Sequence, residues 1–279
     1  MISIPPYPLP SAPEKKIHFR APTVADCIDF SDLRPELEEQ STTEYLTQLQ
    51  EGGEVSNPAL WTAQDRRTAL WWIFVSSAAD TSLAYSYPCQ HCGETHHVDI
   101  DLVELDDMAT ALDRPPFMEG EVRVNGEFKA AHFHPLDGRA VTHLEELRME
   151  LENSEPARHK RLKTEMKVAE ILHSFTLLEW ADLPWEEALA KKRELVTAMD
   201  RESEYKPLVA QCLIAAAELR HGLAVEINEG RVDLVSPALP CETFLAKQKE
   251  QSEEEAAGEP VPATVLLLRF RAGQFIPAI

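Results

Sequence analysis

The stretch that decides the fold is Tyr87 to His97, YPCQHCGETHH. Cys89 and Cys92 stand in C-x2-C spacing, which predicts a tight turn that presents both sulfurs to one tetrahedral ion. Gly93 follows, and glycine permits the left-handed backbone that such a turn often needs. SLAYSYP before the turn and HHVDIDL after it alternate in polarity, so we expect two strands joined by a zinc-ribbon-like knuckle.

Zinc prefers four protein ligands in a structural site, and a second C-x2-C is absent from the sequence. We therefore expect the remaining ligands to be histidines. His96 or His97 is the candidate for the third ligand. His132 or His134 is the candidate for the fourth, because alternate residues of a strand share one face.

Other chemistry at the C-x2-C pair is less well supported by the sequence. A redox pair of the thioredoxin kind would need its cysteines at the start of a helix, but a strand follows them here. A catalytic zinc would need an open coordination position and a base such as Glu94. The H-x-E partner of the deaminase pattern and the HExxH motif are both absent. A metal-free relic of a ribbon remains the third interpretation.

Composition limits the classes of partner. The 279 residues carry a net charge of −21, which argues against binding nucleic acid or an anionic membrane surface. No apolar run approaches the roughly 20 residues needed to cross a bilayer, and the first residues lack the pattern of a signal peptide. Five scattered cysteines do not suggest a disulfide framework, so we expect synthesis in a reducing cytoplasm.

The predicted fold class is α+β, with the knuckle and a β-hairpin in an N-terminal part, then a mostly helical part and a C-terminal strand. Six prolines predict an extended arm over residues 1–22. Residues 23–140 are expected to form the α+β domain, with a short helix near 42–49 and a helix that Thr62 caps and that ends near Ser77. Asn125-Gly126 predicts a type I′ turn between two strands.

The second half of the chain reads mainly as helix. Helical periodicity dominates from about residue 141 to Gly222, and we expect a mainly helical domain over residues 141–245, with a short strand pair around INEGRVDL near its end. Residues 246–262 are acidic and end in proline, which is typical of a linker. Residues 263–279 are too apolar for a solvated tail and should dock as a strand on this chain or on a neighbour.

Six segments occur in an order that resembles the T-even baseplate protein family of contractile-tailed bacteriophages. They are FRAPTVADCIDF (19–30), WTAQDRRTALWWI (61–73), YPCQHCGETHHVDIDLVEL (87–105), HFHPLDGRAV (132–141), INEGRVDL (227–234) and RFRAGQFIP (269–277). The resemblance covers roughly residues 17–140, and more weakly the rest. Cys89 and Cys92 match the family's knuckle.

The resemblance implies a non-catalytic protein of the tail baseplate, either a structural component of the central hub or a chaperone for its assembly. Implied partners are baseplate hub or other tail proteins, with further copies of the same chain as an additional candidate. Implied locations are the host cytoplasm during assembly and the virion tail baseplate. The alternative is a zinc-dependent hydrolase or deaminase that uses Cys89, Cys92 and a histidine.

Overall fold

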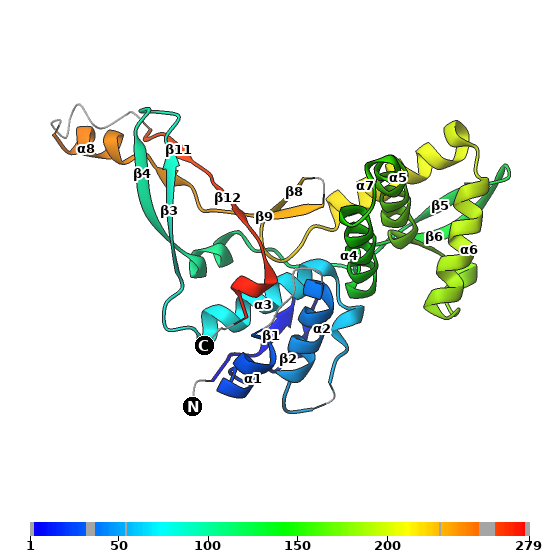
Figure 1. Cartoon of the computed structure of the whole chain (residues 1–279), viewed down its shortest axis with the longest axis horizontal. Helices are drawn as coiled ribbons and strands as arrows, with labels where there is room; N and C mark the ends of the chain where they lie inside the picture. The colour runs from blue at the N-terminus through cyan, green and yellow to red at the C-terminus, as the bar shows by residue number, and fades with distance from the viewer. Residues whose placement is uncertain (1–2, 32–36, 54, 229, 251–259, 277–279) are drawn as a thin grey trace.

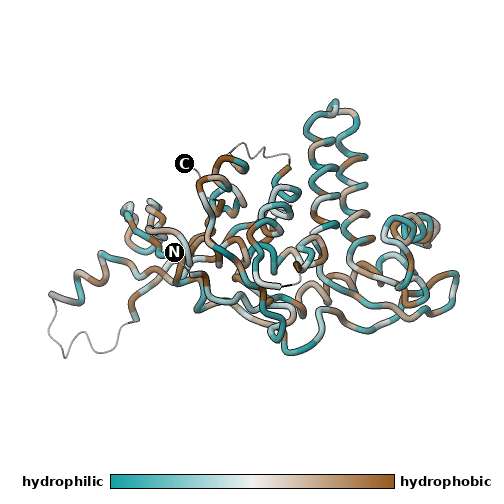
Figure 2. Tube along the Cα trace, turned by 90° about the horizontal axis from the view of Figure 1, so that it is seen from below, coloured by the Kyte–Doolittle hydropathy of each residue, from teal (hydrophilic) through white to brown (hydrophobic). Residues whose placement is uncertain are grey.

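The computed structural model describes residues 3–31, 37–53, 55–228, 230–250 and 260–276. Its helices and strands form an elongated α+β molecule (Figures 1 and 2). In Figure 1 the hairpin β3–β4 and helix α8 lie toward one end, and the hairpin β5–β6 and helix α6 lie toward the other. Two separate hydrophobic cores underlie this shape.

The first core gathers both ends of the described chain around helix α3. The elements of this first unit are β1 (Tyr7–Leu9), β2 (Ala12–Ile17), α1 (Val24–Asp29), α2 (Glu38–Gln48), η2 (Pro58–Leu60), α3 (Ala63–Ser77), β3 (Ser82–Pro88), β4 (Thr95–Asp101), η3 (Leu102–Met108), β8 (Val225–Asn228), β9 (Arg231–Val235), β10 (Leu239–Pro240), α8 (Glu242–Glu250), β11 (Ala263–Thr264), β12 (Leu267–Arg269) and η6 (Ala272–Gln274). Trp72 of α3 donates its indole N–H to the Pro5 carbonyl, and Phe74 packs edge-on against Phe275. Helix α3 therefore joins the first and last described segments.

Thr62 caps α3 as predicted, through a reciprocal capping box with Asp65. The Asp65 carboxylate also accepts hydrogen bonds from the Ser11 backbone N–H at 2.9 Å and from the Ser11 hydroxyl at 2.6 Å. The Tyr7 hydroxyl donates to the Asp65 carbonyl at 2.8 Å. The start of α3 thus fixes the N-terminal hairpin.

The predicted extended arm over residues 1–22 is wrong for its described part. Strands β1 and β2 pair antiparallel, and Tyr7, Leu9, Ile17 and Phe19 are buried in the first core. The prolines do not prevent this, because a two-stranded hairpin has outer edges where a missing N–H costs no ladder hydrogen bond. Residues 1–2 lie outside the described part.

The second core is built by a three-stranded sheet and its helices. Its elements are β5 (Met118–Val124), β6 (Glu127–Phe133), α4 (Gly138–Glu152), α5 (Pro156–His173), β7 (Phe175–Leu177), η4 (Leu178–Trp180), α6 (Trp185–Ala198), η5 (Arg201–Tyr205) and α7 (Lys206–Glu218). The sheet order is β5-β6-β7, and the turn at Asn125-Gly126 has positive φ at both residues, as predicted for type I′. The sheet buries Val122, Ala131 and Phe133 against helices α5 and α7.

The two cores divide the chain differently from the predicted domain boundaries at residues 140 and 245. Strand β7 pairs with β6 in the register Phe133 to Phe175, so the β5–β6 hairpin belongs with the helices that follow it. Thr110 and Gly222 exchange two backbone hydrogen bonds of 3.0 and 2.7 Å. The segment between them is therefore inserted into the first unit, and the chain leaves and returns at one place.

The C-terminal strand is present and docks on its own chain. Strand β12 pairs with β9, β11 pairs with β10, and Leu268, Phe275 and Ile276 enter the first core. Helix α8 occupies the beginning of the predicted acidic linker (residues 246–262), and residues 251–259 and 277–279 lie outside the described part. No helix among the described residues is long and apolar enough to cross a bilayer.

Candidate metal centre

Four side chains from two parts of the chain meet at the tip of the β3–β4 hairpin: Cys89, Cys92, His96 and Cys241. One donor atom from each lies within 4.8 Å of all the others, and all but Cys92, which is half-buried, are buried. We call this group the clasp, because it joins the hairpin to the chain at the start of α8. The clasp residues could hold a metal ion.

The hairpin turn aims its two sulfurs inward through its backbone. The Cys89 N–H donates to the Glu94 carbonyl at 2.8 Å, and the Gly93 N–H donates back to the Cys89 carbonyl at 2.9 Å. Gly93 has φ 79°, the left-handed conformation that its position after C-x2-C predicted. His96 lies on β4 opposite Tyr87, so its imidazole falls on the same side as the knuckle.

Cys241 lies 152 residues after Cys89 in the sequence. Its N–H donates to the Pro262 carbonyl at 2.9 Å, and its carbonyl accepts from the Leu245 N–H in the first turn of α8. The His91 Nε2 also lies 3.2 Å from the Ala263 carbonyl oxygen. Both the segment entering α8 and the segment carrying β11 are therefore held against the knuckle.

Three distances between the donor atoms are close to those of a tetrahedral zinc site, and all of the donor atoms lie within 4.8 Å of one another. The Cys89 and Cys241 sulfurs are 3.7 Å apart, and the His96 Nε2 is 3.3 Å from the Cys92 sulfur and 3.6 Å from the Cys241 sulfur. Zinc–sulfur bonds of about 2.3 Å and zinc–nitrogen bonds of about 2.0–2.1 Å give tetrahedral edges of about 3.8 Å between sulfurs and about 3.5 Å between sulfur and nitrogen. The donor set of three sulfurs and one imidazole fits this ion.

Groups around the clasp favour the ligand forms of its side chains. Polar contacts with the Thr243 hydroxyl and the Glu94 amide lower the pKa of the Cys92 thiol. Burial raises the pKa of Cys89, but hydrogen bonds with the backbone amides of Cys92 and His91 and with the Cys241 and Cys92 side chains together lower the pKa overall. Burial raises the pKa of Cys241, so a bound cation would have to stabilise this thiolate.

The second ring nitrogen of His96 faces a carboxylate. The Glu242 Oε2 lies 3.5 Å from the His96 Nδ1, and the Thr243 hydroxyl donates to the Glu94 Oε2 at 2.9 Å. A carboxylate beside Nδ1 favours the tautomer with its proton there, which leaves Nε2 free to bind a metal. Nε2 is the nitrogen that points to Cys92 and Cys241.

The predicted histidine ligands divide between the clasp and other places. His96 belongs to the clasp, whereas the His97 ring lies on the exposed side of the ribbon, with Nδ1 2.7 Å from the Ser86 hydroxyl. His132 and His134 are not brought to the knuckle, because β6 belongs to the second core. His132 stacks on Phe117 at 4.0 Å, and the His134 Nε2 lies 3.0 Å from the Thr176 hydroxyl.

Cys241 takes the place expected for those histidines, and sequence reasoning missed it. Two signals pointed to it. The knuckle was short of ligands, and Pro240-Cys241 repeats the Pro-Cys pair that opens the knuckle at Pro88-Cys89. The sequence distance hid the relation, because only the folding of β10 and β11 against the hairpin brings the two pairs together.

Two hollows of about 170 and 140 Å³ lie away from the clasp, one beside β2, residues 50–53 and Val55, the other between α1, α3 and Phe275. Neither is lined by a clasp residue.

Searches of protein-family models, curated proteins and solved structures return no match to this chain.

Proposed function

We propose that the clasp binds a structural zinc ion and that the protein is a non-catalytic component or assembly chaperone of a bacteriophage tail baseplate, acting through contacts with hub or other tail proteins. The single observation that supports a structural rather than a catalytic zinc site is the number of ligands: four protein donors surround one point. Catalytic zinc sites keep a position for water or substrate, and structural sites close it with a fourth side chain.

The role of zinc in this proposal is to hold two distant parts of the chain together. When bound, the ion supplies a four-way link between the β3–β4 hairpin and the start of α8. Apolar packing around the clasp contributes little to holding the hairpin against the start of α8. The buried apolar group at the tip is small and consists of Tyr87, Cys89 and Cys241 with a few half-buried neighbours. Small apolar cores often depend on a metal for stability.

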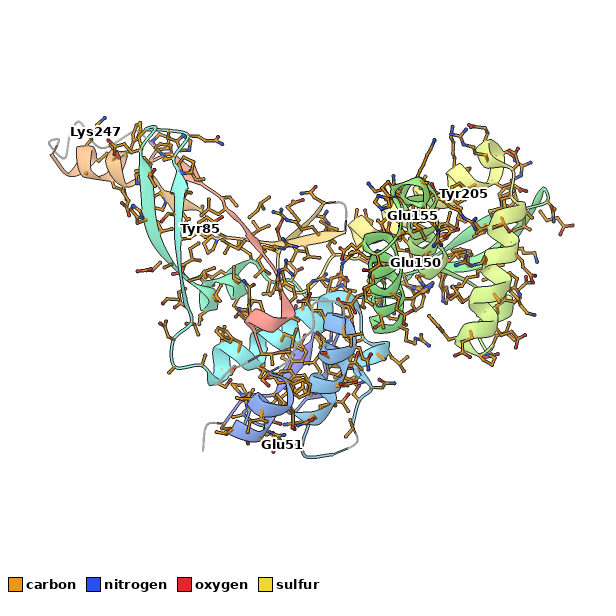
Figure 3. All side chains as sticks on the ribbon, in the orientation of Figure 1. Glu51, Tyr85, Glu150, Glu155, Tyr205 and Lys247 are labelled. Carbon is orange, nitrogen blue, oxygen red and sulfur yellow. The ribbon has the colours of Figure 1, made fainter. Side chains whose placement is uncertain are left out.

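The baseplate role rests on the resemblance of the six quoted segments, and the architecture is compatible with it. An elongated chain with two cores offers separate surfaces at its two ends (Figure 1). In Figure 3, Lys247 on α8 and Tyr205 before α7 mark elements that stand toward these ends. Such a shape suits a protein that bridges neighbours in an assembly.

The first experiment separates the proposal from its rival, a zinc-dependent hydrolase or deaminase. Metal analysis of the purified protein should give one zinc per chain, and cobalt substitution should give the visible spectrum of a tetrahedral thiolate-rich site. A cobalt spectrum that changes on adding azide or another small anion would indicate an open position and would favour the enzyme.

The second experiment tests the phage role. A tagged chain expressed during infection by the phage that encodes it should capture baseplate hub proteins, and mass spectrometry of purified particles then separates the two roles. A stoichiometric amount in the particle identifies a virion component, and absence with retained capture identifies a chaperone. Failure to capture any tail protein would contradict the baseplate role without affecting the metal centre.

A further inference from the structure

Cys89 and Cys241 form a thiol pair inside the clasp. The Cys89 thiol donates a hydrogen bond to the Cys241 sulfur at 3.7 Å, so the two sulfurs are in direct contact. A disulfide bond is about 2.05 Å long, which requires the sulfurs to approach by about 1.7 Å. The pair joins the knuckle to the start of α8 across 152 residues. One covalent bond between these sulfurs would therefore make the same connection as the proposed zinc ion.

Burial distinguishes this pair from the third sulfur of the clasp. Cys89 and Cys241 are 2% and 1% accessible and belong to the small apolar group at the hairpin tip. Cys92 is half-buried, and its sulfur lies 3.3 Å from the His96 Nε2. A disulfide carries no charge and no polar hydrogen, so it fits the apolar surroundings of Cys89 and Cys241 better than two thiolates do. Burial also shields the bond from the thiolates that reduce disulfides.

We propose that Cys89 and Cys241 form a disulfide when the clasp loses zinc and a hydroperoxide is present, so that the clasp has two mutually exclusive closed states. In the first state one zinc ion is held by all four ligands. In the second state the disulfide uses two of these ligands, and Cys92 and His96 alone are too few for a structural zinc site. Only the exchange between the two states rests on the proposed function, because the disulfide itself needs no metal.

The oxidation transfers two electrons from the two sulfurs to hydrogen peroxide. One sulfur, as a thiolate, attacks a peroxide oxygen, the O–O bond breaks, and hydroxide leaves while a sulfenic acid forms. The second sulfur attacks the sulfenic sulfur, the S–S bond forms, and a second hydroxide leaves. The two thiol protons convert both hydroxides into water. A link that first involves the half-buried Cys92 gives the same final product, since thiol–disulfide exchange among sulfurs within 4.8 Å of one another moves the link to the buried pair.

The two closed states suit the two environments that the proposed function implies. Thiols stay reduced in the cytoplasm, where zinc would close the clasp, whereas disulfides persist outside the cell. A chain that remains in the phage particle passes from the first environment to the second on release. The disulfide would then keep the hairpin against α8 after zinc is lost to the medium.

Peptide mapping after controlled oxidation tests the link. The full-length chain is stripped of zinc with a chelator, freed of the chelator, treated with hydrogen peroxide and left to equilibrate after the peroxide is destroyed by catalase. Two of the five thiols should be lost, and mass spectrometry should identify the peptides of Cys89 and Cys241 as joined. The zinc-loaded chain should release its ion as the link forms, which a zinc-binding dye records.

Cys92→Ser is the matched control, because it removes one clasp sulfur and leaves the proposed pair intact. It should form the same link in the same yield, and circular dichroism checks that it is folded. A second measurement uses the wild-type chain alone. After oxidation, its melting temperature should no longer fall when a chelator is added, and it should fall when dithiothreitol reduces the link.

The outcomes separate this proposal from the proposed zinc ion. A link of Cys89 to Cys92 or of Cys92 to Cys241 at equilibrium, retention of all five thiols in the zinc-free chain, or a folded Cys92→Ser chain without the link would overturn the disulfide and leave the zinc site untouched. A purified chain that takes up no zinc but joins Cys89 to Cys241 would support the disulfide and contradict the zinc ion.

Discussion

Replacing Cys241 by serine is the perturbation that the clasp predicts most sharply. Cys241 is the ligand that connects the two distant parts of the chain, because the other three lie within one hairpin. With zinc bound, the unfolding of the clasp must open a link across 152 residues. Without Cys241 the hairpin retains three ligands, but the long link is gone.

The size of the effect follows from the length of the closed loop. The chain-entropy relation for a cross-link over 152 residues gives a contribution of about 5 kcal/mol to the free energy of unfolding. For a chain of this size, each kcal/mol shifts the melting temperature by roughly 2–4 °C. We therefore expect Cys241→Ser to lower the melting temperature of the zinc-loaded protein by at least roughly 10 °C.

The assay compares four samples by differential scanning fluorimetry: wild type and Cys241→Ser, each with zinc and with a strong chelator. The chelator should lower the wild-type melting temperature to nearly that of the variant, and should change the variant much less. Cys27→Ser, a half-buried cysteine outside the clasp, serves as control and should respond to the chelator as wild type does. Equal melting temperatures in all four samples would refute the reasoning.

Three further predictions concern other buried polar groups. Burial and neighbouring cationic groups lower the pKa of His173 to about 3, so the folded state keeps its side chain neutral while the unfolded state binds a proton below about pH 6.5. The free energy of unfolding should therefore decrease as the pH falls from about 6.5 toward 3, by up to about 1.4 kcal/mol per pH unit. Chemical denaturation should show this decrease in wild type and a smaller one in His173→Gln. Asp65→Ala should cost at least about 3 kcal/mol in urea unfolding, because it removes the acceptor for Ser11 and for the Thr62 N–H, which is the reciprocal half of the capping box of α3; a loss below about 1 kcal/mol would contradict this role. Glu242→Gln should weaken zinc binding about tenfold in chelator competition, and Glu226→Gln, on an exposed strand position, should not; equal affinities would show that Glu242 does not orient His96.

The sequence correctly predicted those structural features that are determined by a few neighbouring residues. The helix cap at Thr62, the positive-φ pair Asn125-Gly126 and the alternation around Cys89 each act within a few residues, and each was confirmed. The same holds for the knuckle turn, where Gly93 adopts the expected backbone. Such features need no knowledge of the rest of the chain.

The errors concern contacts between distant segments. The proline-rich start was expected to be an arm, but Asp65 binds Ser11 across 54 positions and turns it into part of the core. The helical pattern after Gly138 did not indicate that β7 would return to β6. The fourth clasp ligand likewise depends on β10 and β11 folding against the hairpin. Periodicity reports which face of an element is buried, but not which element covers it.

The most direct measurement for the central claim is zinc X-ray absorption spectroscopy on the purified, zinc-loaded protein. Three cysteines and one histidine predict a first shell of three sulfurs at about 2.3 Å and one nitrogen at about 2.0 Å, unchanged by added anions. In Cys241→Ser the sulfur count should drop to two. A wild-type shell that contains an exchangeable oxygen, or that has only two sulfurs, would contradict the account.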